Sequence, residues 1–206
     1  MREFYLRYGK RYFDLFVSIV SLVVLLPVFL LVAVAIKLED GGPIFFFQER
    51  VGRDFSTFKV VKFRTMTTDP QVAGPLVTSE NDKRITKVGK ILRKLKIDEL
   101  PQIFNVLRGE MSIVGPRPEV PKYAKLFEKE YRKLLTVRPG MTGYASVVFR
   151  NEEQVLSRYT EPEIGYVTEI LPKKIELELI YVSRVSFILD VKIFLWTFLK
   201  VLGGYW

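Results

Sequence analysis

The chain has 206 residues, no cysteine, no histidine and a formal net charge of +9. The missing side chains exclude disulfides, thiolate nucleophiles and histidine-dependent catalysis or zinc binding within these residues. Any chemistry must use carboxylates, Lys, Arg, Tyr, hydroxyls and a hard cation such as Mg²⁺ or Mn²⁺, and the basic charge favours an anionic partner.

The first predicted element is a membrane segment. Residues 1–14 are rich in basic side chains, and residues 15–36 carry no charge over a length that could cross a bilayer. Pro27 lies near the middle, and each half reaches about half-way across a core of roughly 30 Å. We expect a re-entrant helix-break-helix that returns to the cytoplasmic face. A kinked spanning helix and a buried core helix are the alternatives.

A β-hairpin is predicted next. Residues 44–51 and 55–64 are rich in Phe and Val, and they flank the turn sequence Gly52-Arg53-Asp54. Lys62 and Arg64 are two positions apart, which places them on one face of the second strand. They are candidate anion ligands, although a solvated strand face is the simpler reading.

Two adjacent carboxylates, Asp98 and Glu99, follow a predicted loop over 67–82 and a predicted short basic helix over 85–95. Proline is tolerated in the first turn of a helix, so Pro101 predicts a helix that begins near Asp98 with Asp98 as its N-cap. An isolated Asp in this position is usually only a cap. Basic residues on both sides make this pair a candidate for phosphate chemistry.

Two arginines lie in proline-containing turns. Arg117 is part of Gly115-Pro116-Arg117-Pro118, and Arg138 begins Arg138-Pro139-Gly140-Met141-Thr142-Gly143. Proline stiffens the backbone on both sides of Arg117, and a preorganised guanidinium suits bidentate phosphate binding. The alternative is two ordinary turns.

The rest of the chain predicts helices over 120–137, 173–183 and 187–202. The last helix is apolar but contains Asp190 and Trp196, so we expect it to lie in the membrane interface rather than to span the membrane. A core helix of the globular domain is the alternative.

Taken in order, the motifs resemble those of the bacterial sugar transferases, the small monotopic phosphoglycosyl transferases. Family members often have Ser-Pro at the membrane break, where this chain has Leu26-Pro27. The motifs that carry the resemblance are Lys10-Arg11-Tyr12-Phe13-Asp14, Gly42-Pro43-Ile44-Phe45-Phe46-Phe47-Gln48, Lys62-Phe63-Arg64-Thr65-Met66, Leu92-Arg93, Asp98-Glu99-Leu100-Pro101-Gln102, Asn105-Val106-Leu107-Arg108-Gly109-Glu110-Met111-Ser112 and the two arginine turns.

The resemblance implies an α+β, mostly helical fold. Residues 1–40 would form the membrane-inserted segment, and 41–206 a compact cytoplasmic catalytic domain with a small β-hairpin and interfacial amphipathic helices. The enzyme would transfer a phospho-sugar from a nucleotide diphosphate sugar, a UDP-sugar by analogy, to undecaprenyl phosphate. This step would start glycan assembly at the cytoplasmic face of the bacterial inner membrane.

The resemblance also implies roles for single residues. Asp98 would be the nucleophile that forms a covalent phosphosugar intermediate, with Glu99 beside it at a Mg²⁺ (or Mn²⁺) ion, and Asp190 would be a supporting residue. The implied substrate-binding residues are Arg93, Arg117, Lys62, Arg64 and Arg138.

Two other functions stay open on the sequence alone. The first is a membrane-anchored basic interaction module without catalysis, although no nucleic-acid-binding signature is present. The second is a Mg²⁺-dependent hydrolase of phosphorylated lipids. The sequence leaves a homo-oligomer open and does not identify the sugar, whose selectivity we expect to reside in 67–82 and 144–172.

Overall fold

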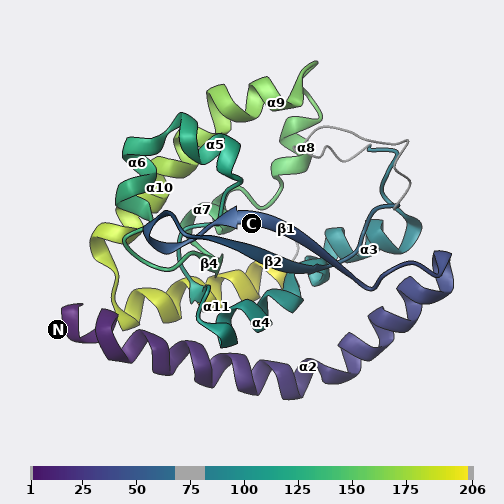
Figure 1. The fold of residues 1–206 in the computed structure, drawn as a ribbon, viewed down its shortest axis with the longest axis horizontal. Coiled ribbons are helices and arrows are strands. Elements are labelled where there is room, and N and C mark those ends of the chain that lie inside the picture. The colour runs from purple at the N-terminus through teal and green to yellow at the C-terminus, as the bar shows by residue number, and fades with distance from the viewer. Residues whose placement is uncertain (1, 68–81, 204–206) are drawn as a thin grey trace.

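The computed structural model describes residues 2–67 and 82–203, with side chains described up to Lys200. Most of the loop predicted over 67–82 therefore lies outside the described residues. The described part is mostly helical with two small sheets, as expected from the sequence (Figure 1). Its α-helices are α1 (Arg2–Phe4), α2 (Lys10–Asp40), α3 (Lys87–Leu95), α4 (Ile103–Arg108), α5 (Pro121–Leu126), α6 (Glu128–Leu134), α7 (Tyr144–Val148), α8 (Glu152–Leu156), α9 (Pro162–Gly165), α10 (Leu171–Arg184) and α11 (Phe187–Gly203).

The N-terminal helix α2 is continuous through Pro27, so the predicted break into two separate helices is wrong. A single proline removes one helical hydrogen bond and bends a helix without having to end it. Figure 1 shows α2 bent, with the rest of the protein on its concave side. The helix stops at Gly41, whose left-handed φ of 72° is readily adopted by glycine.

Both ends of α2 are bound to the same globular domain. Near the N-terminal end, Lys10 Nζ donates to Asp190 Oδ2 at 2.5 Å and to the Val114 carbonyl at 2.8 Å. At the C-terminal end, the Arg64 guanidinium donates to the Asp40 carboxylate, with one bond of 2.6 Å. The helix therefore lies along the domain and does not project away from it.

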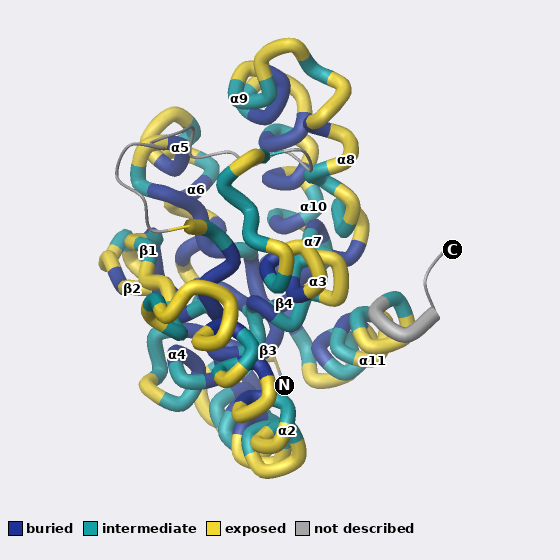
Figure 2. Tube along the Cα trace, turned by 90° about the vertical axis from the view of Figure 1, so that its right-hand side faces the viewer, coloured by how far each residue is buried: buried dark blue, intermediate teal, exposed yellow. Residues whose placement is uncertain are grey.

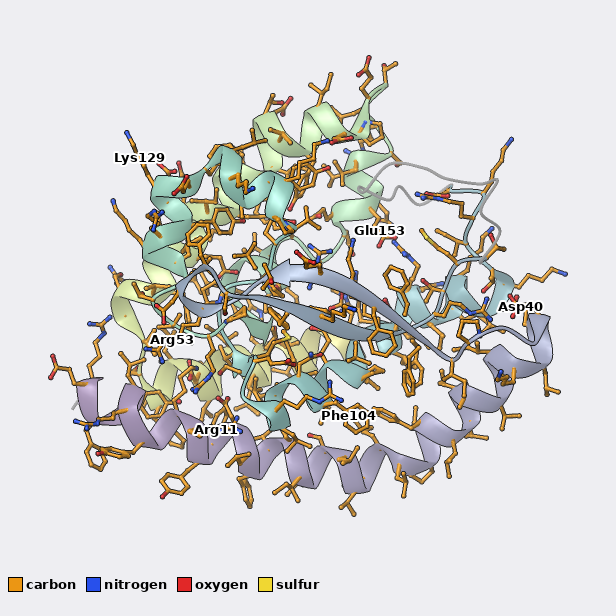
Figure 3. The ribbon with its side chains drawn as sticks, in the orientation of Figure 1. Arg11, Asp40, Arg53, Phe104, Lys129 and Glu153 are labelled. Atoms are coloured by element: carbon orange, nitrogen blue, oxygen red, sulfur yellow. The ribbon has the colours of Figure 1, made fainter. Side chains whose placement is uncertain are left out.

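The two faces of α2 differ in their surroundings. On the inner face, the Phe29 ring contacts Phe63 and Phe104 at centroid distances of 5.2 and 6.0 Å, and Arg11 donates to backbone carbonyls of α4 (Figure 3). Only 11% of the most apolar 18-residue window of this helix is buried, so it is not a core helix of a soluble protein. Figure 2 shows exposed stretches along α2, and the exposed apolar residues of this helix include Phe16, Ile19, Val20, Val23, Val24, Leu26, Leu30, Leu31, Val34 and Leu38.

The predicted β-hairpin is confirmed. Strands β1 (Phe45–Val51) and β2 (Thr57–Phe63) pair antiparallel around a short 3-10 turn, η2 (Arg53–Phe55). A second, parallel pair joins β3 (Ser112–Val114) to β4 (Gly140–Thr142). This second pair brings the two proline-containing arginine turns close together.

Glycine is required where these two turns meet. A Cβ atom on Gly140 would lie 2.1 Å from the Gly115 backbone nitrogen, so no larger residue fits without moving the backbone. This close contact restricts the backbone of the turn that carries Arg117, which lies just after β3.

Two predicted helices are revised. The stretch around the two carboxylates is a 3-10 helix, η4 (Ile97–Gln102), with Pro101 inside it, and α4 begins only after it. The expected helix over 120–137 is divided into α5 and α6 at Phe127, whose φ of −121° and ψ of 44° leave helical geometry while its ring packs against the main core. The remaining irregular segments are the π-helical turns η1 (Tyr5–Gly9) and η5 (Tyr166–Ile170).

The C-terminal helices agree with the sequence. The predicted helix over 173–183 lies within α10, and the one over 187–202 lies within α11. On α11, Asp190 and Ile193 are buried, whereas Ile188 and Leu199 are exposed. This helix thus has one face against the domain and a second apolar face that the protein leaves uncovered.

Candidate active site

The two adjacent carboxylates are positioned by an unusual backbone turn. Lys96 ends α3 in the left-handed region, with φ 58° and ψ 22°, a conformation that costs a non-glycine residue some free energy. The turn directs η4 against β2, so that Asp98 and Glu99 come beside Lys62. Asp98 makes no capping hydrogen bond, and its predicted role as an N-cap is wrong.

Both carboxylate oxygens of Glu99 accept hydrogen bonds from cationic side chains. Arg117 donates to its two carboxylate oxygens at 2.6 and 3.1 Å, and Lys62 Nζ donates to Oε1 at 3.0 Å. Burial alone would raise the pKa of Glu99, but Arg117 and then Lys62 outweigh it and hold that pKa well below its usual range. Glu99 is therefore ionised at neutral pH and fixes both cations in place.

Asp98 is buried beside this ion pair but does not share its partners. Its Oδ1 atom has no hydrogen-bond partner among the described residues. Burial, followed by the neighbouring charge of Glu99, raises the pKa of Asp98 to about 6 against the opposing effects of Lys62, Lys96 and Arg93. A buried carboxylate oxygen with no partner is costly for folding, which points to a functional role.

Arg93 and Arg64 are held by other carboxylates. Arg93 donates to Glu153 at 2.7 Å, and both residues line the cavity described below. Arg64 is engaged by Asp40 and does not contact Glu99, so the shared strand face does not bring Lys62 and Arg64 to the same partner. The substrate-binding roles of Arg93 and Arg64 stay predictions.

Two further predicted residues lie away from the carboxylate pair. Arg138 Nε donates to the Gly109 carbonyl at 2.8 Å, and the side chain does not line the cavity. Asp190 is fully buried and accepts hydrogen bonds from Lys10, Tyr5 and Tyr181, an arrangement consistent with a supporting role.

Asp98 and Glu99 open into a cavity of about 990 Å³. Its wall includes a second set of polar residues that the sequence analysis missed. Lys174 Nζ donates to Glu152 at 2.7 Å and to the Tyr166 hydroxyl at 3.3 Å, and Tyr166 in turn donates to Glu119. Glu119 directly follows the Arg117 turn, but Glu152, Tyr166 and Lys174 belong to none of the quoted motifs, so no local signal identified the set.

The site fits a divalent cation only if the substrate completes its coordination. No group of three or more acidic residues that could hold a metal ion occurs within 2–67 and 82–203. Mg²⁺ is commonly bound by one or two carboxylates together with substrate phosphates. Asp98 Oδ1 is available for such a site, whereas both Glu99 oxygens are already occupied by cationic side chains.

Comparison with known proteins decides the family. The model of the bacterial sugar transferase family matches residues 5–204. The chain belongs to this family. The predicted family membership is thereby confirmed.

Named relatives of this bacterial sugar transferase include two phosphotransferases. The chain is 37% identical over 203 residues to the UDP-N-acetylgalactosamine-undecaprenyl-phosphate N-acetylgalactosaminephosphotransferase of Aeromonas hydrophila, covering 95% of this chain and 44% of that protein. It is 42% identical over 191 residues to the undecaprenyl-phosphate glucose phosphotransferase of Komagataeibacter xylinus, covering 89% of this chain and 34% of that protein. The chain thus spans less than half the length of both relatives.

A third relative is closer to this transferase in length. The chain is 41% identical over 165 residues to an exopolysaccharide production protein of Sinorhizobium fredii, and the match covers 73% of each protein.

Proposed function

We propose that this protein transfers a phospho-sugar from a UDP-sugar to undecaprenyl phosphate, releasing UMP and starting the assembly of a glycan. The observation that carries the proposal is the contrast within the carboxylate pair. Arg117 and Lys62 hydrogen-bond to Glu99, while the Oδ1 atom of its buried neighbour Asp98 has no partner within 2–67 and 82–203. The names of the relatives support the same donor and acceptor classes.

In the proposed reaction, an Asp98 carboxylate oxygen attacks the β-phosphorus of the donor. A bond from Asp98 to phosphorus forms while the bond to the bridging oxygen breaks, and UMP leaves with that electron pair. A phosphate oxygen of the acceptor then attacks the same phosphorus and releases the Asp98 carboxylate. Aspartate is an established type of phosphoryl acceptor in enzymes.

The surrounding residues offset the repulsion between a carboxylate and a diphosphate. Arg117 and Lys62 are preorganised by Glu99 and lie partly buried, where charge stabilisation is stronger than in water. Asp98 Oδ1 would hold Mg²⁺ together with the donor phosphates, and the cation would supply further charge neutralisation, while Glu99 would act by holding Arg117 and Lys62 in place.

The membrane topology is part of the proposal. The two ends of α2 bind the same domain through Lys10 and Asp40, and its outer face is apolar along its length. A helix that crossed the bilayer would place its ends about 30 Å apart on opposite sides. We therefore propose that α2 is re-entrant, enters from the cytoplasmic face of the inner membrane and returns to it, and so keeps Asp98 near the headgroups where lipid phosphates lie.

The reaction is tested by UMP release from purified protein in detergent, given undecaprenyl phosphate, Mg²⁺ and a panel of UDP-sugars. The proposal expects release that depends on the acceptor, on the metal and on Asp98. Release without acceptor would instead indicate a hydrolase. If no UDP-sugar and no other nucleotide sugar gives release, the non-catalytic basic module becomes the better account.

The topology is tested separately by cysteine labelling, because the natural chain contains no cysteine. Glu3→Cys lies before α2, and Asp54→Cys lies in the hairpin turn after it. A membrane-impermeant maleimide should label both positions in inside-out vesicles and neither in intact spheroplasts. Opposite labelling of the two positions would show a spanning helix.

A further inference from the structure

Helices α2 and α11 meet at one end and together line the catalytic cavity beyond that contact. At the meeting point, the Phe13 ring contacts Phe187 and Phe194 edge-on, at centroid distances of 5.8 and 6.4 Å. Further along, Val17, Ser21 and Leu25 of α2 line the cavity that also contains Asp98. Figure 2 shows α2 at the bottom of the protein and α11 at its lower right.

The spacing of these residues defines a wall on each helix. Val17, Ser21 and Leu25 recur every four residues, so they form one face of α2 about 12 Å long. On α11, Phe194, Thr197 and Phe198 share a face and line the same cavity. We call the space between the two walls the α2–α11 groove.

The walls of the groove offer an apolar ligand few polar groups to desolvate. The Thr197 hydroxyl, on the α11 wall, is already paired with Thr142 at 2.7 Å and donates to the Ile193 carbonyl at 2.8 Å. The other polar residues that these two helices contribute to the cavity lining are Ser21 and, one turn beyond Thr197, Lys200, while the rest are valine, leucine and phenylalanine. Burial of a hydrocarbon chain here would be favourable at roughly 25 cal/mol per Å².

The same cavity is also lined by strongly charged side chains. Arg117, Lys62 and Arg93 line it together with the carboxylate pair. The cavity as a whole therefore suits a molecule with an anionic head and an apolar tail. Beside the groove, the outer faces of α2 and α11 expose apolar side chains such as Val24 and Leu199, 67% and 66% exposed, so such a molecule could enter from a bilayer.

We infer that the α2–α11 groove holds the first isoprene units of the polyprenyl phosphate acceptor and guides its phosphate to Asp98. The inference rests on the proposed function and adds to it a binding site for the tail. An acceptor bound only through its phosphate would need no apolar wall continuous with the catalytic cavity. A bulk phospholipid is a poorer fit to this continuity, because its phosphate has no role at Asp98.

The groove is tested by filling it and comparing acceptors with long and short tails. Ser21 has the smallest side chain of the α2 wall and is half-buried, so Ser21→Trp should fill the space. The matched control is Val24→Trp, which places the same ring on the outer face. The measured quantity is the ratio of kcat/KM for undecaprenyl phosphate to kcat/KM for the short citronellyl phosphate.

The inference expects Ser21→Trp to lower this ratio by about tenfold and Val24→Trp to leave it close to the wild-type value. An unchanged ratio in Ser21→Trp would overturn the inference. An equal fall in both variants would overturn it too, because that result would indicate that a tryptophan on either face changes how the protein inserts into the membrane.

A second pair of variants keeps the test decisive if Ser21→Trp does not fold. Phe198→Ala removes part of the α11 wall, and Leu199→Ala is its control on the outward face. Only Phe198→Ala should lower the ratio. Failure of the proposed function itself would be recognised separately, as absence of acceptor-dependent UMP release in the wild-type protein.

Discussion

Two buried charge clusters in this protein use similar side chains to different ends. In the anchor cluster of Lys10, Asp190, Tyr5 and Tyr181, each carboxylate oxygen of Asp190 has a donor: Lys10 and Tyr5 at 2.5 and 2.7 Å on one, and Tyr181 at 2.8 Å on the other. The cluster joins α2 to α11. Such complete pairing is expected where a buried charge has a structural role.

The carboxylate-pair cluster of Asp98, Glu99, Lys62 and Arg117 is complete at one carboxylate and incomplete at the other. Glu99 receives three hydrogen bonds, whereas Asp98 Oδ1 receives none from the residues that the structure describes. The comparison teaches that complete pairing accompanies a structural role, and that Asp98 differs by combining an unpartnered oxygen with a place in the lining of the cavity. The same isosteric substitution should therefore have opposite consequences in the two clusters.

The largest expected effect is the loss of activity in Asp98→Asn. The amide keeps the shape but cannot act as the nucleophile, so UMP release should fall by at least about 10⁴-fold. Removing a charge that is buried beside Glu99 should leave the melting temperature unchanged or higher. Turnover close to wild type would refute the role of Asp98.

The next effect is the loss of stability in Asp190→Asn. This change leaves the Lys10 ammonium buried without its counter-charge, which should cost about 3–5 kcal/mol in the free energy of unfolding. Thermal or chemical unfolding in detergent measures the loss. The double variant Lys10→Met/Asp190→Leu should recover much of it, and a single variant as stable as wild type would contradict the structural role of the cluster.

A smaller effect is expected for Arg117→Lys. Lysine keeps the charge but cannot donate to both oxygens of Glu99 in the fork geometry of arginine. We expect kcat/KM to fall by about 10²-fold, with the loss shared between donor binding and turnover. Steady-state kinetics with the best UDP-sugar measure it. Activity within twofold of wild type would show that charge alone suffices.

The last prediction concerns how the free energy of unfolding changes with pH, and it involves Glu178 of α10. Its Oε1 accepts from the Ala145 amide at 3.2 Å, and burial raises its pKa to about 8 despite the backbone amides of Ala145 and Arg117 and the charges of Lys174 and Arg117. The unfolded acid loses its proton near the ordinary value of 4.5. Between about pH 4.5 and 8 the folded state holds the extra proton, so Glu178 makes stability fall as pH rises.

Glu178→Gln should remove this contribution, because glutamine resembles the protonated acid and can still accept from the Ala145 amide. We compare the unfolding midpoints of the variant and the wild type at pH 5 and at pH 8. The stability of the variant relative to the wild type should be greater at pH 8 than at pH 5. Parallel curves for the two proteins would contradict the raised pKa.

Local patterns in the sequence predict much of this architecture. The hairpin, the basic helix before Asp98 and the apolar length of α2 follow from periodicity, turn residues and hydropathy. The carboxylate pair is visible because its basic neighbours are close in sequence. The resemblance to family motifs then predicts its place in the reaction.

Contacts between distant segments explain what the sequence does not predict. The bend of α2 without a break depends on its inner face packing against the domain, as Phe29 does on Phe63 and Phe104. Similarly, the tertiary fold determines the partners of Arg64 and Lys174. Each pairs with a carboxylate about twenty positions away in the sequence, and no local sequence pattern predicts such a pair.

The most direct test of the central claim is to trap the intermediate. The protein is incubated with the active UDP-sugar and Mg²⁺ without acceptor, quenched rapidly in acid, and examined by intact-protein and peptide mass spectrometry. The account predicts an added phospho-sugar mass on the peptide that contains Asp98, lost on adding undecaprenyl phosphate and absent in Asp98→Asn. An adduct on another residue, or turnover with no adduct at any quench time, would contradict it.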